Sequence, residues 1–353
     1  MNDRHTLHLA LQGGGAHGAF TWGALDRLLD EPTIDIGRIS GTSAGALNAA
    51  ALATGMVHGG RDGARRNLAL LWQKAAEAGT LATLMMLPLR KPSLGLWDDS
   101  MPLLPPALAN PMGILPLRQV LEQVIDQDAL RSPDAPRVYV NAVRVRDGAT
   151  RLFGPAELSI DALLASACAP QLFSGVEIEG EVYWDGSYTA NPVMVPLYRG
   201  LEQADVLLVE LSPLHRVETP VSAKNILNRI NEIASTAGLV AELGRLHVYR
   251  QAHPAVRMHL LSMPDSAVPA LLDASIKRSA DMVLFQALRQ EGWRCCDQWL
   301  RQNRSAVGHA STVDLEARYL RPYAVMPDGW PASYGILESA DVAVGSGRPE
   351  LPR

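Results

Sequence analysis

A serine set between glycines is the first residue whose surroundings point to chemistry. Residues 41–45 read Gly-Thr-Ser-Ala-Gly, a G-x-S-x-G motif between an apolar run and an alanine-rich run. The motif is typical of a nucleophile elbow, a strained strand-to-helix turn that holds a serine hydroxyl clear of its neighbours. Small flanking residues suit such a turn, and the motif supplies Gly41, Thr42, Ala44 and Gly45. The pattern therefore predicts Ser43 as the nucleophile of an acyl-transfer reaction.

A glycine-rich turn upstream is the second chemical candidate. Residues 13–18 follow an apolar run, precede a helical pattern and fit G-x-G-x-x-G. Backbone N–H groups at such a turn bind anions, either the pyrophosphate of a dinucleotide or the oxyanion of an acyl-transfer intermediate. The residues of this predicted oxyanion loop are Gly13, Gly14, Gly15, Ala16, His17 and Gly18. Each motif alone has a structural alternative, a turn that only packs a helix on a strand, but the two together favour acyl transfer.

An aspartate further along the chain is the candidate base. The segment Tyr-Trp-Asp-Gly-Ser ends in Asp185, Gly186 and Ser187, so the acid closes an aromatic strand and enters a glycine turn. At that place a carboxylate can point back into a cleft. Without Ser43 the segment would be interpreted as an ordinary Asp-Gly turn. With Ser43 present, Asp185 is predicted to accept the serine proton.

A histidine base is the alternative to direct proton transfer onto Asp185. The order Ser-Asp-His of a triad is open, because several histidines follow the candidate acid. They are His215, His247, His253, His259 and His309. None of them lies in a recognisable motif. The acids are scattered and the histidines lack a spacing such as H-E-x-x-H, so we predict no metal site and no cofactor.

The chain around these motifs alternates between strand and helix patterns. Expected strands cover 7–11, 34–40, 137–146, 150–153 and 206–211, and expected helices cover 19–29, the run after 45, 117–125 and 158–168. The strands at 137–146 and 150–153 flank Asp147-Gly148 and are expected to form a hairpin. Strand, glycine turn and helix in repetition predict an α/β fold with a mostly parallel sheet covered by helices.

Composition limits the class of protein. The chain has 353 residues, a net charge of −5 and 47% hydrophobic residues, which excludes general disorder and argues against a nucleic-acid partner. Its three cysteines cannot build a disulfide framework and favour a reducing compartment. The amino terminus does not resemble a secretory signal, and no run approaches the roughly 18 apolar residues of a membrane span. We therefore expect a cytoplasmic protein, with contact at a membrane surface left open.

Two stretches depart from the strand-helix alternation. Residues 81–116 mix leucine and methionine with prolines, so we expect an irregular insertion, either packed on the core or covering the Ser43 cleft. Beyond residue 215 the pattern becomes helical. The expected organisation is a catalytic domain over 1–215, a helical region over 216–310 that forms a cap or second lobe, and a tail over 311–353.

Taken in order, these blocks resemble the patatin-like phospholipases. The resemblance covers residues 7–212 and rests on the loop at 13–18, the elbow at 41–45, the segment 165–170 and the acid block at 185–192. It implies a three-layer α/β/α fold and a Ser43–Asp185 dyad acting on lipid acyl esters without histidine. The pocket residues that it implies are Ser166, Pro170 and Asn191. The chain departs from the family at His17, usually Arg or Lys, and at Ser187, often a second glycine.

Two alternative functions remain open at this stage. A dinucleotide-dependent oxidoreductase would use residues 13–18, but it would leave the elbow and Asp185 without a role, and Asp35 stands at the start of its strand instead of at its end. A catalytically silent relative would bind lipid or a partner on the same fold. The head group, the acyl position and the oligomeric state are not determined by the sequence.

Overall fold

The computed structural model describes residues 4–86, 110, 112–212, 214, 219–221, 223–264 and 281–323. Its strands are β1 (His5–Leu11), β2 (Ile34–Gly41), β3 (Val138–Arg144), β4 (Thr150–Phe153), β5 (Val176–Ile178), β6 (Glu181–Asp185), β7 (Ala204–Glu210) and β8 (Val256–Ser262). Its α-helices are α1 (Gly18–Leu29), α2 (Ala44–Met86), α5 (Leu115–Val124), α6 (Gln127–Arg131), α7 (Ile160–Ser166), α8 (Val195–Tyr198), α9 (Ala223–Ala252) and α10 (Met282–Asn303). Short helical turns include η1 (Gly15–His17), η3 (Gly186–Tyr188), η6 (Arg304–Ala306), η7 (Glu316–Leu320) and η8 (Arg321–Tyr323).

All of these strands join one sheet in the order β5-β6-β3-β2-β1-β7-β8, with β4 paired to β3. Strands β3, β2, β1, β7 and β8 run parallel, whereas β4 and β6 run antiparallel to β3. The mostly parallel sheet expected from the sequence is therefore confirmed. The expected hairpin is confirmed as well, because β3 and β4 pair directly.

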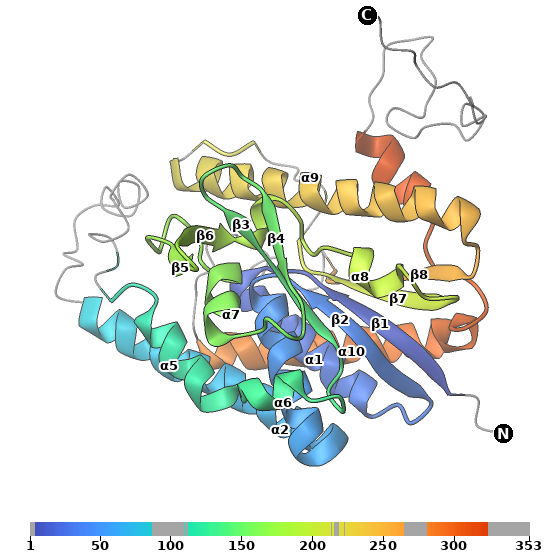
Figure 1. Ribbon diagram of the computed structural model, residues 1–353, viewed down its shortest axis with the longest axis horizontal. Helices are drawn as coiled ribbons and strands as arrows, with labels where there is room; N and C mark the ends of the chain where they lie inside the picture. Colours follow the sequence, from blue (N-terminus) through green and yellow to red (C-terminus); the bar gives the residue numbers. More distant parts are fainter. Residues whose placement is uncertain are drawn as a thin grey trace, which may run out of the picture.

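Helices cover both faces of the sheet and make a three-layer α/β/α structure (Figure 1). Helices α1, α2, α5, α7 and α10 pack on one face against alternate strand residues such as Leu9 and Leu207. Helices α8 and α9 pack on the other face against the intervening residues Ala10, Val206 and Leu208. Strand residues point alternately to opposite faces, so apolar runs such as β7 fit a sheet buried on both sides.

The described parts of the chain beyond residue 215 belong to the same layers, which corrects the expected second lobe over 216–310. Strand β8 pairs with β7 along its length, and α9 covers the sheet face beside it. Helix α10 crosses α1 so closely that a Cβ at Gly23 or Gly292 would strike the backbone of the other helix. The expected tail also begins inside the fold, because Tyr319 is fully buried. Residues 324–353 lie outside the described residues.

The expected insertion over 81–116 is helical at both edges. Helix α2 continues to Met86 after a break at Gly59 and Gly60, and α5 begins at Leu115. Residues 87–109 and 111 lie outside the described part of the chain. The expected cover over the Ser43 cleft falls on these residues and stays a prediction.

Candidate active site

The strand register brings the predicted nucleophile and the predicted base to the same edge of the sheet. Gly41, the last residue of β2, pairs with Val140 of β3. Ala142, two residues further along β3, pairs with Asp185 at the end of β6. Asp185 therefore lies level with the position two residues beyond Gly41, which is Ser43. Residues separated by more than a hundred positions meet because β2 and β6 pair with nearby residues of β3 from its two sides.

Ser43 has the backbone conformation of a strained turn. Its φ of 52° lies in the left-handed region, which non-glycine residues rarely adopt and which often marks functional sites. The turn is held by a hydrogen bond from the Gly45 N–H to the Thr42 carbonyl at 2.8 Å. The Ser43 N–H donates to the Ser166 hydroxyl at 2.9 Å. Ser166, predicted as a pocket residue, thus stabilises the elbow through the backbone of Ser43 and does not line the cavity.

Asp185 is a buried carboxyl with few compensating partners. Its side chain accepts the Ser187 N–H at 2.9 Å. Burial raises the pKa of Asp185, and the hydrogen bond from the Ser187 N–H and the nearby Ser43 and Ser187 hydroxyls only partly offset that effect. The serine at 187 therefore adds a hydroxyl beside the acid. A carboxyl with a raised pKa is a better proton acceptor than a free aspartate.

The glycine-rich loop lies directly against the elbow. A Cβ at Gly13 would come within 2.9 Å of the Ser43 Cβ, so only glycine permits this approach. The Gly13 N–H donates to Asn191 Oδ1 at 2.6 Å, which fixes the loop. Among the described residues, the N–H groups of Gly14 and Gly15 have no hydrogen-bond acceptor, and both residues line the cavity beside Ser43. Such groups can bind a developing oxyanion.

The end of the predicted loop does not reach the cavity. Ala16 lines it, but His17 and Gly18 do not. His17 is fully buried, and its N–H bonds to the Gly14 carbonyl at 3.2 Å. Gly18 instead lies against the start of α2, where its Cβ would come within 2.6 Å of the Ala44 Cβ. These two residues shape the loop without facing the cavity.

Sequence reasoning missed Asn141, which joins the elbow to the acid turn. Asn141 is fully buried on β3, and its Oδ1 accepts the Thr42 hydroxyl at 2.6 Å. Its Nδ2 donates to the carbonyls of Gly186 at 3.2 Å and Ala190 at 3.0 Å. One amide therefore links the elbow to the turn that follows Asp185. Its signal in the sequence was an asparagine inside the otherwise apolar core of β3.

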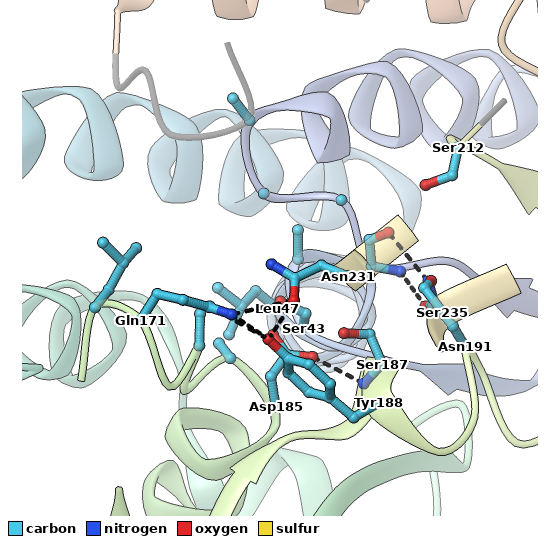
Figure 2. Close-up of a pocket in the computed structure, with 18 of the residues that line it drawn as sticks. Ser43, Leu47, Gln171, Asp185, Ser187, Tyr188, Asn191, Ser212, Asn231 and Ser235 are labelled. Atoms are coloured by element: carbon cyan, nitrogen blue, oxygen red, sulfur yellow. Dashed lines mark hydrogen bonds between the residues drawn. The ribbon is translucent and has the colours of Figure 1, made fainter. Parts of the chain in front are cut away.

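A cavity of about 380 Å³ opens beside Ser43 and Asp185 and has two chemically different walls (Figure 2). The apolar wall comes mainly from α2, α5, α10 and the loop after α7, with Leu47, Trp72, Leu117, Leu172, Phe173 and Phe285. The polar wall comes mainly from α9, η3 and the same loop, with Gln171, Tyr188, Asn228, Asn231, Glu232 and Ser235. Asn191 and Ser187 also line the cavity, whereas Pro170 lies half-buried between the lining residues Ala169 and Gln171.

No histidine lines the cavity within the part of the chain that the structure describes. His259 is fully buried on β8, where its Nε2 lies 2.9 Å from Asp205 Oδ1. The other described candidates for a triad, His247, His253 and His309, are also absent from the cavity lining. His215 lies outside the described residues.

The geometry does not fit a dinucleotide site. Strand β2 ends in the elbow, where such a site needs an acid to hold the ribose. Asp35 lies at the opposite end of β2 and forms ion pairs with Arg4 and Arg61. No cluster of His, Cys, Asp or Glu in the described residues could hold a metal ion. Of the described helices, none combines the length and apolarity that crossing a membrane requires.

The residues of the loop, the elbow and the acid turn all lie within one family match. Residues 9–197 match the family model described as patatin-like phospholipase. The chain belongs to the patatin-like phospholipase family. The three-layer fold that the sequence resemblance implied is thereby confirmed, and the protein is placed among lipid hydrolases. The match ends before β7, so α9 and its part of the cavity wall lie beyond it.

Solved structures show more distant likeness. VipD from Legionella pneumophila is 12% identical with a TM-score of 0.42, over 90% of this patatin-like chain and 73% of VipD. The type III effector protein ExoU is 16% identical with a TM-score of 0.34, over 85% of this chain and 53% of ExoU. ExoU from Pseudomonas aeruginosa in complex with SpcU is 18% identical with a TM-score of 0.32, again over 85% and 53%. The chain thus spans about half the length of the ExoU chains. No curated protein matches the sequence.

Proposed function

We propose that this patatin-like protein is a serine acyl hydrolase that cleaves the carboxylic esters of lipids through a Ser43–Asp185 dyad. The observation that carries the proposal is the placement of Ser43 and the buried Asp185 at the same level of the sheet, where both line one cavity. The strained turn at Ser43 and the raised pKa of Asp185 support the same roles. A nucleophile and its base must lie within hydrogen-bond reach of each other.

In the first half of the proposed reaction, Asp185 accepts the Ser43 proton while the serine oxygen attacks the ester carbonyl. The N–H groups of Gly14 and Gly15 stabilise the negative charge that develops on the carbonyl oxygen. The C–O bond of the ester then breaks. Asp185 returns its proton to the departing alcohol, and an acyl group remains on Ser43.

In the second half, a water molecule takes the place of the alcohol. Asp185 accepts one of its protons, and the resulting hydroxide attacks the acyl carbonyl beside the same N–H groups. The bond to the serine oxygen breaks, and the proton on Asp185 passes to Ser43. One ester and one water thus give one alcohol and one carboxylic acid. The raised pKa of Asp185 suits both transfers, since the group must hold a proton and then release it.

The apolar wall supports a lipid substrate. Trp72 and Phe285 pack edge to face with ring centroids 4.8 Å apart, and both line the cavity. The Trp72 N–H donates to Asn48 Oδ1 at 3.0 Å, so the ring presents carbon atoms to the cavity. An acyl chain bound here excludes water from the dyad, which strengthens electrostatic stabilisation of the oxyanion. Because such substrates reside in bilayers, the proposal includes contact with a membrane surface. It also includes a cytoplasmic location, which the three free cysteines support.

The proposal is tested by replacing the nucleophile. We expect Ser43→Ala to lower kcat for p-nitrophenyl butyrate by about 10³-fold or more, because no covalent intermediate can form. A fluorophosphonate probe should label the wild type and not the variant. Ser305→Ala is the matched control, because this serine is exposed in η6, and it should keep both labelling and turnover. Turnover by folded Ser43→Ala at the wild-type rate would show that Ser43 is not the nucleophile.

A further inference from the structure

The polar wall of the catalytic cavity contains a cluster of side chains that the proposed chemistry does not use. Gln171 Nε2 donates to the Tyr188 hydroxyl at 2.8 Å and to Asn231 Oδ1 at 3.1 Å. The Tyr188 oxygen also lies 3.1 Å from Asn231 Oδ1 and 3.2 Å from Gln171 Oε1. The three side chains converge beside Ser43 (Figure 2). They come from the loop after α7, from η3 and from α9, so tertiary packing alone assembles them.

The hydrogen bonds within this cluster leave some of its donors and acceptors unused. A tyrosine hydroxyl has one proton, so it can donate to only one of the two amide oxygens at a time. Asn231 Nδ2 has no acceptor among the described residues. Gln171, Tyr188 and Asn231 are each half-buried and line the cavity, so a ligand can reach the open groups. A donor and an acceptor side by side match an alcohol hydroxyl, which both accepts and donates.

The charges around the cavity disfavour an anionic ligand. Two carboxyls, Asp185 and Glu232, belong to its lining. Within the described residues, the lining contains no lysine or arginine. Glu232 forms an ion pair with Arg229, whose Nη1 lies 3.4 Å from Glu232 Oε2 and which does not line the cavity. A phosphate would bring negative charge towards these carboxyls, whereas a neutral polyol would not.

The position of the cluster assigns it to one part of the substrate. Ser43 follows β2, between the helix layer that contains α2, α5 and α10 and the layer that contains α9 (Figure 1). The apolar wall belongs mainly to the first layer, and Asn231 belongs to the second. An ester whose acyl chain lies on the apolar wall therefore directs its alcohol portion towards the polar cluster.

We propose that Gln171, Tyr188 and Asn231 form a binding subsite for the alcohol portion of the substrate, and that this portion is uncharged and rich in hydroxyl groups, such as glycerol with free hydroxyls. The inference rests on the proposed function, because it assumes that Ser43 cleaves an acyl ester. Gln171 and Tyr188 lie within the residues that match the family model, whereas Asn231 on α9 lies beyond them.

A binding experiment tests the subsite without requiring turnover. The Ser43→Ala protein is titrated by calorimetry with three uncleavable octyl ethers, those of glycerol, propanol and glycerol 3-phosphate. We expect the glycerol ether to bind about tenfold more tightly than either other ether, the scale of one well-placed hydrogen-bond pair. Equal affinities, or tighter binding of the phosphate ether, would overturn the proposal.

Variants then locate the preference. Tyr188→Phe and Asn231→Leu, each in the Ser43→Ala background, should reduce the preference for the glycerol ether to less than about threefold, because each removes groups that bind hydroxyls. Ile230→Ala is the matched control, since Ile230 neighbours Asn231 on α9 but is 53% exposed. It should keep the full preference. A preference that survives both cluster variants would also overturn the proposal.

Hydrolysis by the otherwise unaltered protein separates this inference from the proposed function. The octanoyl esters of the same three alcohols are compared by kcat/KM, and glycerol should give the highest value. In Tyr188→Phe, the value for the glycerol ester should fall at least about fivefold more than that for the propyl ester. A general positional effect on Asp185 would lower both equally. If no ester is cleaved while the ethers are still discriminated, the proposed function fails, and the cluster remains a binding site for a glycerol group without the role of a substrate subsite. Cleavage without discrimination overturns the subsite alone.

Discussion

Two aspartates are buried in the same sheet, and their surroundings drive their acidities in opposite directions. Asp185 ends β6 beside Ser43 and is 6% exposed, and Asp205 begins β7 and is 4% exposed. Burial raises the pKa of both carboxyls. Around Asp185 only the Ser43 and Ser187 groups oppose that effect, and the pKa stays raised. Around Asp205, hydrogen bonds from His259, Arg257 and the Gly308 N–H outweigh burial and hold the pKa far below its usual range.

The partners of the two carboxyls explain what each can do. Arg257 binds Asp205 through two nitrogens, at 2.9 and 2.7 Å, and the Gly308 N–H lies 2.9 Å away. This cluster links β7 to β8 and to the segment after α10, so its hydrogen bonds stabilise the folded state. Among the described residues, Asp185 has no cationic partner, so its carboxylate is available to accept a proton. Equal burial therefore gives a structural anchor in one place and a candidate base in the other.

Of the two aspartates, Asp185 should give the larger effect when it is replaced, and the effect should be on kcat. Asp185→Asn should lower kcat for a soluble ester by about 10²- to 10⁴-fold, because the amide keeps the shape but cannot accept a proton. Its Tm should stay level or rise, since the variant removes a buried charge with weak compensation. Ester kinetics and calorimetric unfolding measure the two quantities. Asp147→Asn, at an exposed aspartate paired with Arg144 on the β3–β4 hairpin, is the control and should change neither. If Asp185→Asn retained wild-type turnover, Asp185 would not be the base, and the proposed difference in role between Asp185 and Asp205 would be wrong.

The second effect falls on stability. Asp205→Asn should lower the free energy of unfolding by about 3–5 kcal/mol, because it leaves the buried Arg257 without its counter-charge. The folded fraction of this variant should retain wild-type kcat, since Asp205 does not line the cavity. Urea unfolding with active-site titration separates the two quantities. A variant that unfolds like the wild type but loses turnover would mean that the cluster acts on the reaction.

The smallest effects are on pH dependence, and they differ because the pKa of Asp185 is raised and that of Asp205 is lowered. Asp185 must be unprotonated to act, so kcat/KM should fall on the acidic side with a midpoint above 3.8, the ordinary value for an aspartate. Asp205 has a depressed pKa in the folded state, so the stability it contributes is present above about pH 4 and is lost as the pH falls further. Asp205→Asn should therefore flatten the loss of stability below pH 4. An acidic limb of activity that coincides with acid unfolding would contradict separate roles.

Much of the amino-terminal half was predictable because its signals are local. The apolar run before Gly13 and the motif at 41–45 mark strand-to-helix turns by composition alone. The hairpin followed from Asp147-Gly148 between two strand patterns. Strand β8 was missed, because Arg257 and His259 interrupt its apolar pattern and look like surface residues. Asp205, distant in the sequence, compensates for both, so their burial could not be inferred from the strand itself.

The sequence by itself determined the residue types and the local turns of this protein: a serine between glycines, a glycine-rich loop and an aspartate before a turn. Short-range sterics decide such features, since only certain residues fit a left-handed elbow or permit Gly13 to touch it. Only the tertiary structure decided that Asp185 meets Ser43, that Asn141 joins their turns and that α9 supplies the polar wall. Strand register and helix packing set those contacts, and desolvation then fixes the acidity of each buried carboxyl; neither is encoded within a short window of sequence.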